Sequence, residues 1–169
     1  MTSPWRTLRT SRGLRNLALT GAAATASAAA GAFATTPGTR WYADLDKPAW
    51  QPPPIAFPLV WTPLYADIAV VSAAALTTIE GQGRNDEVAA FRTALAVNLV
   101  LNTGWSVLFW RARKPWLSTT WCAVLTASSA DLARRAGHVD GSLRRALAPY
   151  PAWCAFATAL NASLARRNS

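Results

Sequence analysis

The charged residues of this chain are confined almost entirely to its N-terminal tail and to short clusters between apolar stretches. Five stretches are nearly free of charge: residues 16–39, 59–79, 93–110, 115–133 and 146–165. Each approaches the roughly 20 residues that an α-helix needs to cross the core of a bilayer. Charged residues make up only 15% of the chain, against roughly 25% in an ordinary soluble domain. The sequence therefore predicts an all-α membrane protein, a five-transmembrane-helix bundle.

No linker or composition break divides the chain, so residues 1–169 are expected to form a single domain. The predicted helices span about residues 16–36, 58–79, 88–110, 115–133 and 143–165. Residues 37–57 are rich in proline, which removes backbone donors and prevents a continuous helix. With Trp41, Tyr42 and Trp50, this segment is predicted to be a structured loop against the membrane interface. An odd number of helices places the two termini on opposite faces.

The net charge of +9 is distributed as expected for a protein in a membrane. Basic residues cluster at the ends of the apolar stretches, where they suit phospholipid headgroups. No nucleic-acid-binding motif accompanies them, so we expect membrane lipid and no nucleic acid as a partner. Lys and Arg number ten on the side of the N terminus and seven on the other side, which favours an internal N terminus.

The first apolar stretch permits two interpretations. Basic residues, an Ala-rich run and an A-x-A sequence at residues 32–34 are typical of a secretory signal with a cleavage site. The apolar run is longer than the roughly 7 to 15 residues of a signal core, which favours a retained helix.

Small and polar residues recur every four positions on two of the predicted helices, which indicates faces that pack against protein. On the first helix these are Gly21, Thr25 and Ala29 on one face, and Ser27 and Gly31 on another. On the third helix they are Ala90, Ala94, Asn98, Asn102 and Ser106.

The two cysteines, Cys122 and Cys154, lie inside apolar stretches, which predicts free, buried thiols. The only histidine, His138, lies in a basic segment and is expected to be a solvated loop residue. Since no spacing of cysteine and histidine offers a metal site, we expect neither a metal nor a cofactor.

Two acids lie within apolar stretches, and an acid in such a position is a candidate functional residue. Asp131 is near the end of the fourth helix beside Arg134 and Arg135, so an interfacial ion pair is expected. Asp67 lies deeper in the second helix, and two interpretations stay open. It has a role with a ligand, an ion or a proton, or it makes a buried structural hydrogen bond.

Six of the nine tryptophans form two groups by position, Trp41 and Trp50 belong to the loop at 37–57, and Trp121 is unassigned. Trp5, Trp110 and Trp116 lie at predicted helix ends beside arginines, which is typical of an interfacial belt. Three predicted helices instead place rings and polar groups together on one face. The second helix has Trp61 and Tyr65, and the third has Trp105 and Phe109 beside Asn102 and Ser106. The fifth has Tyr150, Trp153 and Ala157 beside Asn161. A cavity lined in this way suits a planar apolar ligand.

Three segments are distinctive in sequence: WYADLDKPAWQPP at 41–53, LNTGWSVLF at 101–109 and PYPAWCAFATALN at 149–161. In order and spacing they resemble the tryptophan-rich sensory protein and translocator protein family, TspO, also called peripheral-type benzodiazepine receptors. The resemblance implies a five-helix protein of the bacterial cell membrane with a retained first helix, commonly a homodimer. It also implies a pocket for porphyrins, such as protoporphyrin IX or a haem-related tetrapyrrole, closed by the first loop.

Spacing and resemblance together give a set of candidate ligand-binding residues: Tyr42, Trp50, Pro52, Trp61, Tyr65, Asn102, Trp105, Ser106, Phe109, Tyr150, Trp153 and Ala157. Three functions are consistent with it. The first is a porphyrin-binding receptor or sensor, with translocation of the porphyrin as an extension. The second is light- and oxygen-dependent porphyrin breakdown, for which the resemblance implies Trp61 and Trp153 as the catalytic pair. The third is a small secondary transporter of another hydrophobic ligand, a class in which internal repeats are common, and this chain shows no convincing repeat.

Overall fold

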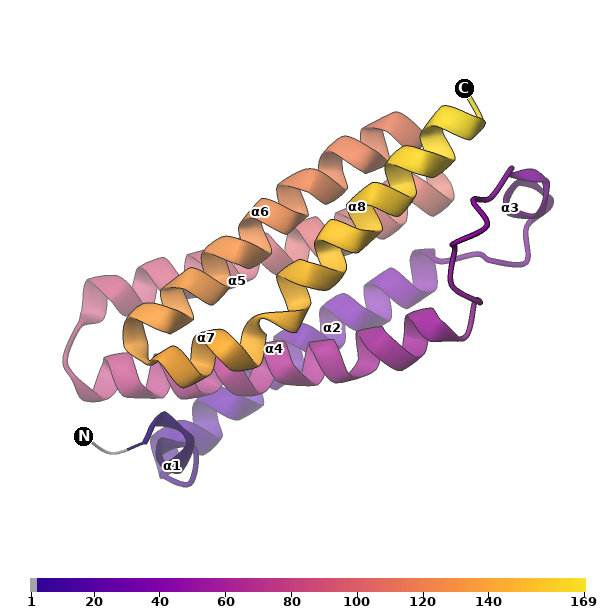
Figure 1. The fold of residues 1–169 in the computed structure, drawn as a ribbon. Coiled ribbons are helices and arrows are strands. Elements are labelled where there is room, and N and C mark those ends of the chain that lie inside the picture. Colours follow the sequence, from indigo (N-terminus) through magenta and orange to yellow (C-terminus); the bar gives the residue numbers. More distant parts are fainter. Residues whose placement is uncertain (1–2) are drawn as a thin grey trace.

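The computed structural model describes residues 3–169, which form helices, turns and loops without a strand. In chain order the elements are α1 (Pro4–Thr7), α2 (Ser11–Ala34), α3 (Arg40–Asp44), α4 (Ala56–Gly81), α5 (Asn85–Ser106), the π-helical turn η1 (Val107–Arg111), α6 (Pro115–Val139), α7 (Gly141–Leu147) and α8 (Pro149–Arg167). The long helices α2, α4, α5, α6 and α8 run along one another in an elongated bundle (Figure 1).

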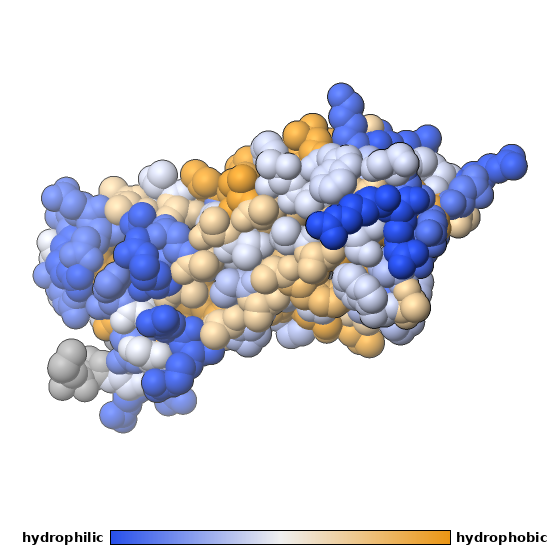
Figure 2. All heavy atoms as spheres, turned by 45° about the horizontal axis from the view of Figure 1, so that its top comes forward, coloured by the Kyte–Doolittle hydropathy of each residue, from blue (hydrophilic) through white to orange (hydrophobic). Residues whose placement is uncertain are grey.

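The bundle has the length and surface of a membrane protein. Three helical stretches are long and apolar enough to cross a bilayer: Ser11–Ala34, Ala56–Gly81 and Asn85–Arg111. On the face shown in Figure 2, hydrophobic residues form a band between hydrophilic ends. α1 and the C-terminal end of α8 lie at opposite ends of the bundle, as predicted (Figure 1). The predicted five-helix membrane bundle is therefore confirmed.

Two helices extend beyond their predicted limits for local reasons. α2 begins at residue 11 instead of residue 16, because the Thr10 hydroxyl caps it by accepting a hydrogen bond from the Gly13 amide at 3.1 Å. α6 continues to residue 139 instead of residue 133. Its charged end stays helical because Asp131 pairs with Arg134 and Arg135, three and four positions along the helix.

The predicted fifth helix, residues 143–165, is in fact two helices. α7 ends at Leu147 and α8 begins at Pro149. Proline is tolerated in the first turn of a helix, but its ring and missing N–H prevent a preceding helix from continuing through it. The break lets α7 contact α4 and α6, while α8 packs along α6.

The third transmembrane helix ends in the π-helical turn η1, which the sequence analysis did not predict. Its wider turn is marked by the hydrogen bond from the Ala112 amide to the Val107 carbonyl, 3.0 Å. Two consecutive side chains, Phe109 and Trp110, are buried there. The prediction that Trp110 is an interfacial anchor is therefore wrong, because this turn directs its ring into the protein. π-helical turns are frequent at functional sites.

The buried face of α2 contains Ser27 and Gly31, as predicted. The Ser27 hydroxyl lies 2.9 Å from the Thr103 hydroxyl of α5. The polar residues of α2 turn towards such partners because lipid offers none. The other predicted face lies away from the neighbouring helices of this chain: Gly21, Thr25 and Ala29. Its packing against protein stays a prediction.

Three members of the predicted stripe on α5 are buried, as expected: Asn98, Asn102 and Ser106. Ala90, in the second turn, is exposed. The Tyr150 hydroxyl donates to Asn98 Oδ1 at 2.8 Å and accepts from Asn102 Nδ2 at 3.1 Å. The Tyr65 hydroxyl donates to Asn102 Oδ1 at 2.8 Å. This hydrogen-bond chain joins α4, α5 and α8 in an interior where an unpaired polar group is costly.

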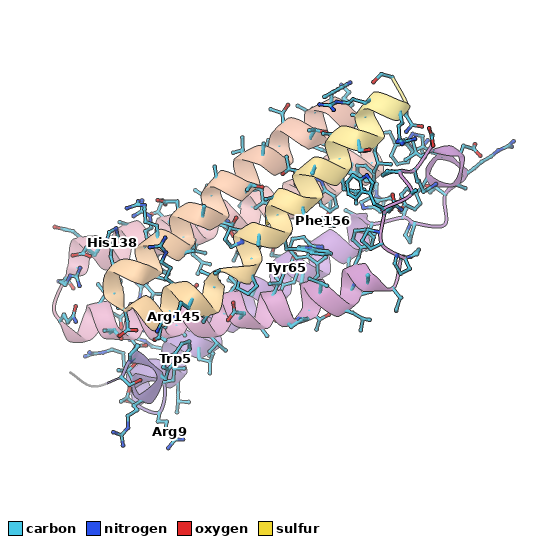
Figure 3. The ribbon with its side chains drawn as sticks, in the orientation of Figure 1. Trp5, Arg9, Tyr65, His138, Arg145 and Phe156 are labelled. Atoms are coloured by element: carbon cyan, nitrogen blue, oxygen red, sulfur yellow. The ribbon has the colours of Figure 1, made fainter. Side chains whose placement is uncertain are left out.

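Trp5 and Trp116 lie at the ends of the bundle, as predicted. The Trp5 indole donates to the Ser142 hydroxyl at 3.0 Å, so it attaches α1 to α7 (Figure 3). Trp116 is half exposed and donates to the Ser169 hydroxyl at 2.9 Å.

The expected ion pairs of Asp131 are confirmed, with Arg134 Nη2 at 2.5 Å and Arg135 Nε at 2.6 Å. Both cysteines are free and buried, as predicted. His138 is exposed, but it lies in the last turn of α6 and not in a loop. The prediction placed the end of this helix too early, for the reason given above.

Gly104 of α5 lies at a close contact with α6. A Cβ at this position would lie 2.8 Å from Cζ2 of Trp121, and that ring is held by a 2.7 Å hydrogen bond from its Nε1 to the Leu101 carbonyl. We expect Gly104→Ala to lower the free energy of unfolding by about 1–3 kcal/mol, seen as a lower thermal midpoint in detergent. The control is Gly21→Ala, where a methyl group meets no atom within 4 Å. Equal midpoints for the two variants would contradict the packing.

Candidate functional site

A narrow cavity lies between α4, α5, α6 and α8. Its wall is formed by rings, aliphatic side chains, two thiols and one amide: Phe57, Trp61, Trp105, Cys122, Leu125, Trp153, Cys154, Ala157, Leu160 and Asn161. The cavity has a volume of about 20 Å³, room for about one water molecule, and is therefore much smaller than the roughly 300–1,000 Å³ of small-molecule sites. An apolar wall with few polar groups favours a hydrophobic ligand.

Two stacked pairs of rings belong to this region. Trp153 and Phe156 on α8 have centroids 5.1 Å apart and planes 28° apart. Trp105 and Phe109 have centroids 5.8 Å apart and planes 16° apart. Residues three or four positions apart share a helix face, which explains both pairs. Figure 3 shows Phe156 on α8 and Tyr65 on α4 on the sides of these helices that face each other.

The loop between α2 and α4, residues 35–55, packs on these rings, and we call it the covering loop. The ring centroids of Trp41 and Phe109 are 5.5 Å apart, those of Trp50 and Phe156 are 5.9 Å apart, and both pairs meet edge to face. Within the segment predicted to be a structured loop, the chain forms the short helix α3. Its tryptophans form an aromatic layer over one end of the cavity region.

Tyr42 gives the covering loop a neutral polar group. Its hydroxyl accepts a hydrogen bond from Gln51 Nε2 at 3.1 Å, and the Lys47 ammonium lies 4.7 Å from the centre of its ring. Burial raises the pKa of the Tyr42 phenol, and the hydrogen bond from Gln51 opposes this only in part. The phenol is therefore uncharged at neutral pH, which suits an apolar site.

The covering loop is fastened to the end of α8 through Asp46. The Asp46 amide donates to Asn168 Oδ1 at 2.9 Å, and its carbonyl accepts from Asn168 Nδ2 at 3.1 Å. Arg167 Nη1 lies 3.2 Å from the Asp46 carboxylate. We call these three contacts the latch. They are exposed and few, so each contributes little and the loop can be released at a small cost.

The profile of the TspO/MBR family matches residues 18–167, which include all of the cavity wall and the covering loop. The chain belongs to the TspO/MBR family. It is accordingly a multi-pass integral membrane protein, as expected. The match includes most of α2, which favours a retained helix over a cleaved signal.

Individual members of the TspO/MBR family are similar over part of their length. The tryptophan-rich protein TspO of Chlorobaculum tepidum is 36% identical over 84 residues, 49% of this chain and 51% of that protein. The tryptophan-rich sensory protein of Cereibacter sphaeroides is 36% identical over 91 residues, 52% and 53% of the two chains. The translocator protein of Ovis aries is 36% identical over 77 residues, 46% and 44%. The matches thus span about half the length of these relatives.

The candidate residues of the TspO/MBR resemblance occupy three layers. Four of them line the cavity: Trp61, Trp105, Trp153 and Ala157. Others belong to the covering loop or to the aromatic layer beneath it: Tyr42, Trp50, Pro52 and Phe109. The remaining ones are interior residues that join helices: Tyr65, Asn102, Ser106 and Tyr150. Whether each of these residues contacts a ligand stays a prediction.

Six residues of the cavity wall are not among the candidate ligand-binding residues, although the sequence analysis placed Asn161 on the same face as Trp153: Phe57, Cys122, Leu125, Cys154, Leu160 and Asn161. Two positions on α8 had a usable signal, because Leu160 and Asn161 both lie about one turn beyond Ala157 and two turns beyond Trp153, on the same side of the helix. Cys122 and Leu125 on α6 had none. They are ordinary core residue types, and only the packing of α6 against α8 brings them to the cavity.

The polar atoms of the cavity wall are few. Trp105 Nε1 donates to Asn161 Oδ1 at 3.3 Å. Trp153 Nε1 is buried and has no hydrogen-bond partner within residues 3–169. The same is true of one carboxylate oxygen of Asp67, which is outside the wall, so the interpretation of Asp67 as a structural hydrogen-bonding residue gains no support. In the described part of the chain no cluster of metal-binding side chains is found.

The latch generates a prediction about access to the cavity. Asn168→Ala removes two hydrogen bonds to Asp46, each contributing about 0.5–1.5 kcal/mol. We expect the wall thiols Cys122 and Cys154 to react about fivefold faster with N-ethylmaleimide in detergent, followed by intact mass. Arg166→Ala, an exposed change next to the latch, is the control and should leave the rate unchanged. Equal rates for both variants would show that the latch does not limit access.

Proposed function

We propose that this protein is a receptor or sensor that binds a porphyrin, such as protoporphyrin IX or a haem-related tetrapyrrole, in the aromatic cavity. The family to which the chain belongs is known for binding porphyrins. The cavity wall supports the proposal, because Trp61, Trp105 and Trp153 supply rings on which a planar macrocycle can stack once the wall has separated.

The observation that carries this proposal is the buried indole nitrogen of Trp153. A buried donor without an acceptor is costly, about 1–3 kcal/mol, and native interiors retain few of them. Trp153 Nε1 has no acceptor within residues 3–169, and its ring forms part of the cavity wall. A ligand with an acceptor at its edge, such as a porphyrin carboxylate, would satisfy this donor while its ring system stacks on the wall.

Entry of so large a ligand requires the wall to separate, because the cavity volume of about 20 Å³ is far below the roughly 300–1,000 Å³ of small-molecule sites. The covering loop is the element best placed to move. It rests on the rings by edge-to-face contacts of Trp41 and Trp50 and is fastened by the exposed latch. We therefore infer that the ligand is admitted by displacement of this loop and sealed by its return, a cycle that translocation would also need.

Two variants of Trp153 test the binding proposal. Trp153→Phe keeps an aromatic ring and removes the donor, so we expect affinity for protoporphyrin IX to fall about two- to tenfold. Trp153→Ala also removes the ring and should weaken binding by about tenfold or more. The measurement is the saturable change of the porphyrin Soret band on titration in detergent. Trp116→Phe, at the exposed end of the bundle, is the control. Saturable binding that is equal in all four proteins would contradict the proposed site.

A second function is favoured by the presence of two indoles, Trp61 and Trp153, in the same cavity wall. If the bound porphyrin is excited by light, an indole can donate one electron to it, and the reduced porphyrin can pass that electron to dioxygen. Addition of the resulting superoxide to the porphyrin ring, with return of one electron to the indole radical, would leave an oxygenated porphyrin and an unchanged indole. Such photo-oxidative breakdown would need no acid, base or metal from the protein. Trp61 and Trp153 would then be the catalytic residues.

Illumination separates the two functions. For an enzyme we expect irreversible loss of the Soret band when the complex is illuminated in air, and no loss under argon or in the dark. Trp61→Phe combined with Trp153→Phe should slow this loss by about tenfold or more, a barrier increase of about 1.4 kcal/mol. Trp116→Phe, which removes an indole at the exposed end of the bundle, is the control and should leave the rate unchanged. An equal rate of loss for the double variant and the wild type, at equal saturation, would assign the reaction to free porphyrin chemistry and leave the protein a binder.

A further inference from the structure

A second groove lies at the other end of the bundle from the covering loop, where the α4–α5 turn meets the end of α6. The space in it is about 700 Å³, including its open side. Its polar walls are formed by Arg84, Glu87, Arg134 and Arg135, and part of its floor by Ile79 and Phe91. His138, at the end of α6, also lines it, and Figure 3 shows this residue far from Phe156 and the aromatic cavity. The groove is therefore separate from the site described above.

The charges in this groove do not balance. Arg84 pairs with Glu87, while Arg134 and Arg135 share the single carboxylate of Asp131. Three arginines thus face two carboxylates. Arg135 contacts Asp131 through Nε at 2.6 Å, which leaves its two terminal nitrogens for another acceptor among the contacts of the described residues. The planar guanidinium group of arginine, with N–H donors free, matches the geometry of the oxygens of a phosphate group.

The apolar floor of this groove favours a lipid over a soluble anion as the ligand. Ile79 and Phe91 are only 2% exposed, so an apolar core lies directly beneath the arginines. The groove is also level with the ends of two membrane-spanning stretches, Ala56–Gly81 and Asn85–Arg111. Phospholipid headgroups occupy this level of a membrane, and basic pockets between transmembrane helices bind anionic headgroups.

We propose that this groove binds the phosphate-bearing headgroup of an anionic phospholipid. The arginines contact the phosphate, and the apolar floor packs against the glycerol end of the acyl chains. Binding would join the α4–α5 turn to the end of α6, two segments that are far apart in the sequence. The site is independent of the aromatic cavity, so it holds whether or not the cavity binds a porphyrin.

The test compares lipids on the intact protein in detergent by native mass spectrometry. We expect dioleoylphosphatidylglycerol to bind saturably and about tenfold more tightly than dioleoylphosphatidylcholine. Arg134→Gln combined with Arg135→Gln should weaken binding of the anionic lipid about tenfold. The matched control is Arg144→Gln combined with Arg145→Gln, which removes the same charge from exposed positions of α7 at the same end. It should change the affinity less than about twofold.

Three outcomes would overturn the proposal: equal affinity for the two lipids, equal weakening by the two double variants, or binding of inorganic phosphate alone as tight as that of the lipid. The last outcome would assign the groove to free phosphate. If the first double variant does not fold, as judged by its thermal midpoint, Arg84→Gln on the opposite wall replaces it. That variant should weaken binding of the anionic lipid about fivefold, and unchanged affinity would equally contradict the proposal.

Discussion

Tyr150 donates to Asn98 and accepts from Asn102 in an interior where no water or lipid group can pair with either amide. The chain of contacts continues through Asn102 to Tyr65 on α4, and through Asn98 to the Ser128 hydroxyl on α6 at 3.2 Å. Four helices are therefore held in one register by these hydrogen bonds. The same four helices, α4, α5, α6 and α8, surround the aromatic cavity, so the polar chain fixes the wall against which a ligand would stack.

The rest of the cavity region is built differently. The wall rests on buried hydrogen bonds, whereas the covering loop is held by ring edges and by the exposed contacts of Asp46 with Arg167 and Asn168. Exposed contacts are worth little compared with buried ones. A rigid wall under a weakly held cover is an arrangement that admits a bulky ligand without unfolding the bundle.

Much of this fold could be predicted from the sequence, because lipid imposes simple rules. Charge-free runs of about 20 residues give helices, and the buried positions of Asn98 and Asn102 follow from their spacing. The predictions from sequence were wrong where local backbone geometry or side-chain pairing determines the structure. Pro149 split the fifth helix, the pairing of Asp131 lengthened α6, and the turn η1 moved Trp110 into the interior.

The candidate site shows the same division. Trp61, Trp105 and Trp153 could be predicted from helical spacing, since each lies on the face that also holds polar residues. Cys122 and Leu125 could not, because only the contact between α6 and α8 places them in the wall. Three predictions depend on the membrane, a ligand or a second chain and stay predictions: the homodimer, the internal N terminus and a role for Asp67. The single domain over residues 1–169 also stays a prediction.

Protection of the cavity thiols is the most direct measurement of the central claim that the ligand lies within the aromatic cavity. Cys122 and Cys154 both line the wall, and they are the only cysteines of the chain, so they report on this space alone. As protoporphyrin IX is titrated to saturation, the rate at which N-ethylmaleimide modifies these thiols should fall in proportion to the fraction of protein that holds the ligand. Saturable porphyrin binding with an unchanged rate of thiol modification would place the ligand elsewhere and contradict the account.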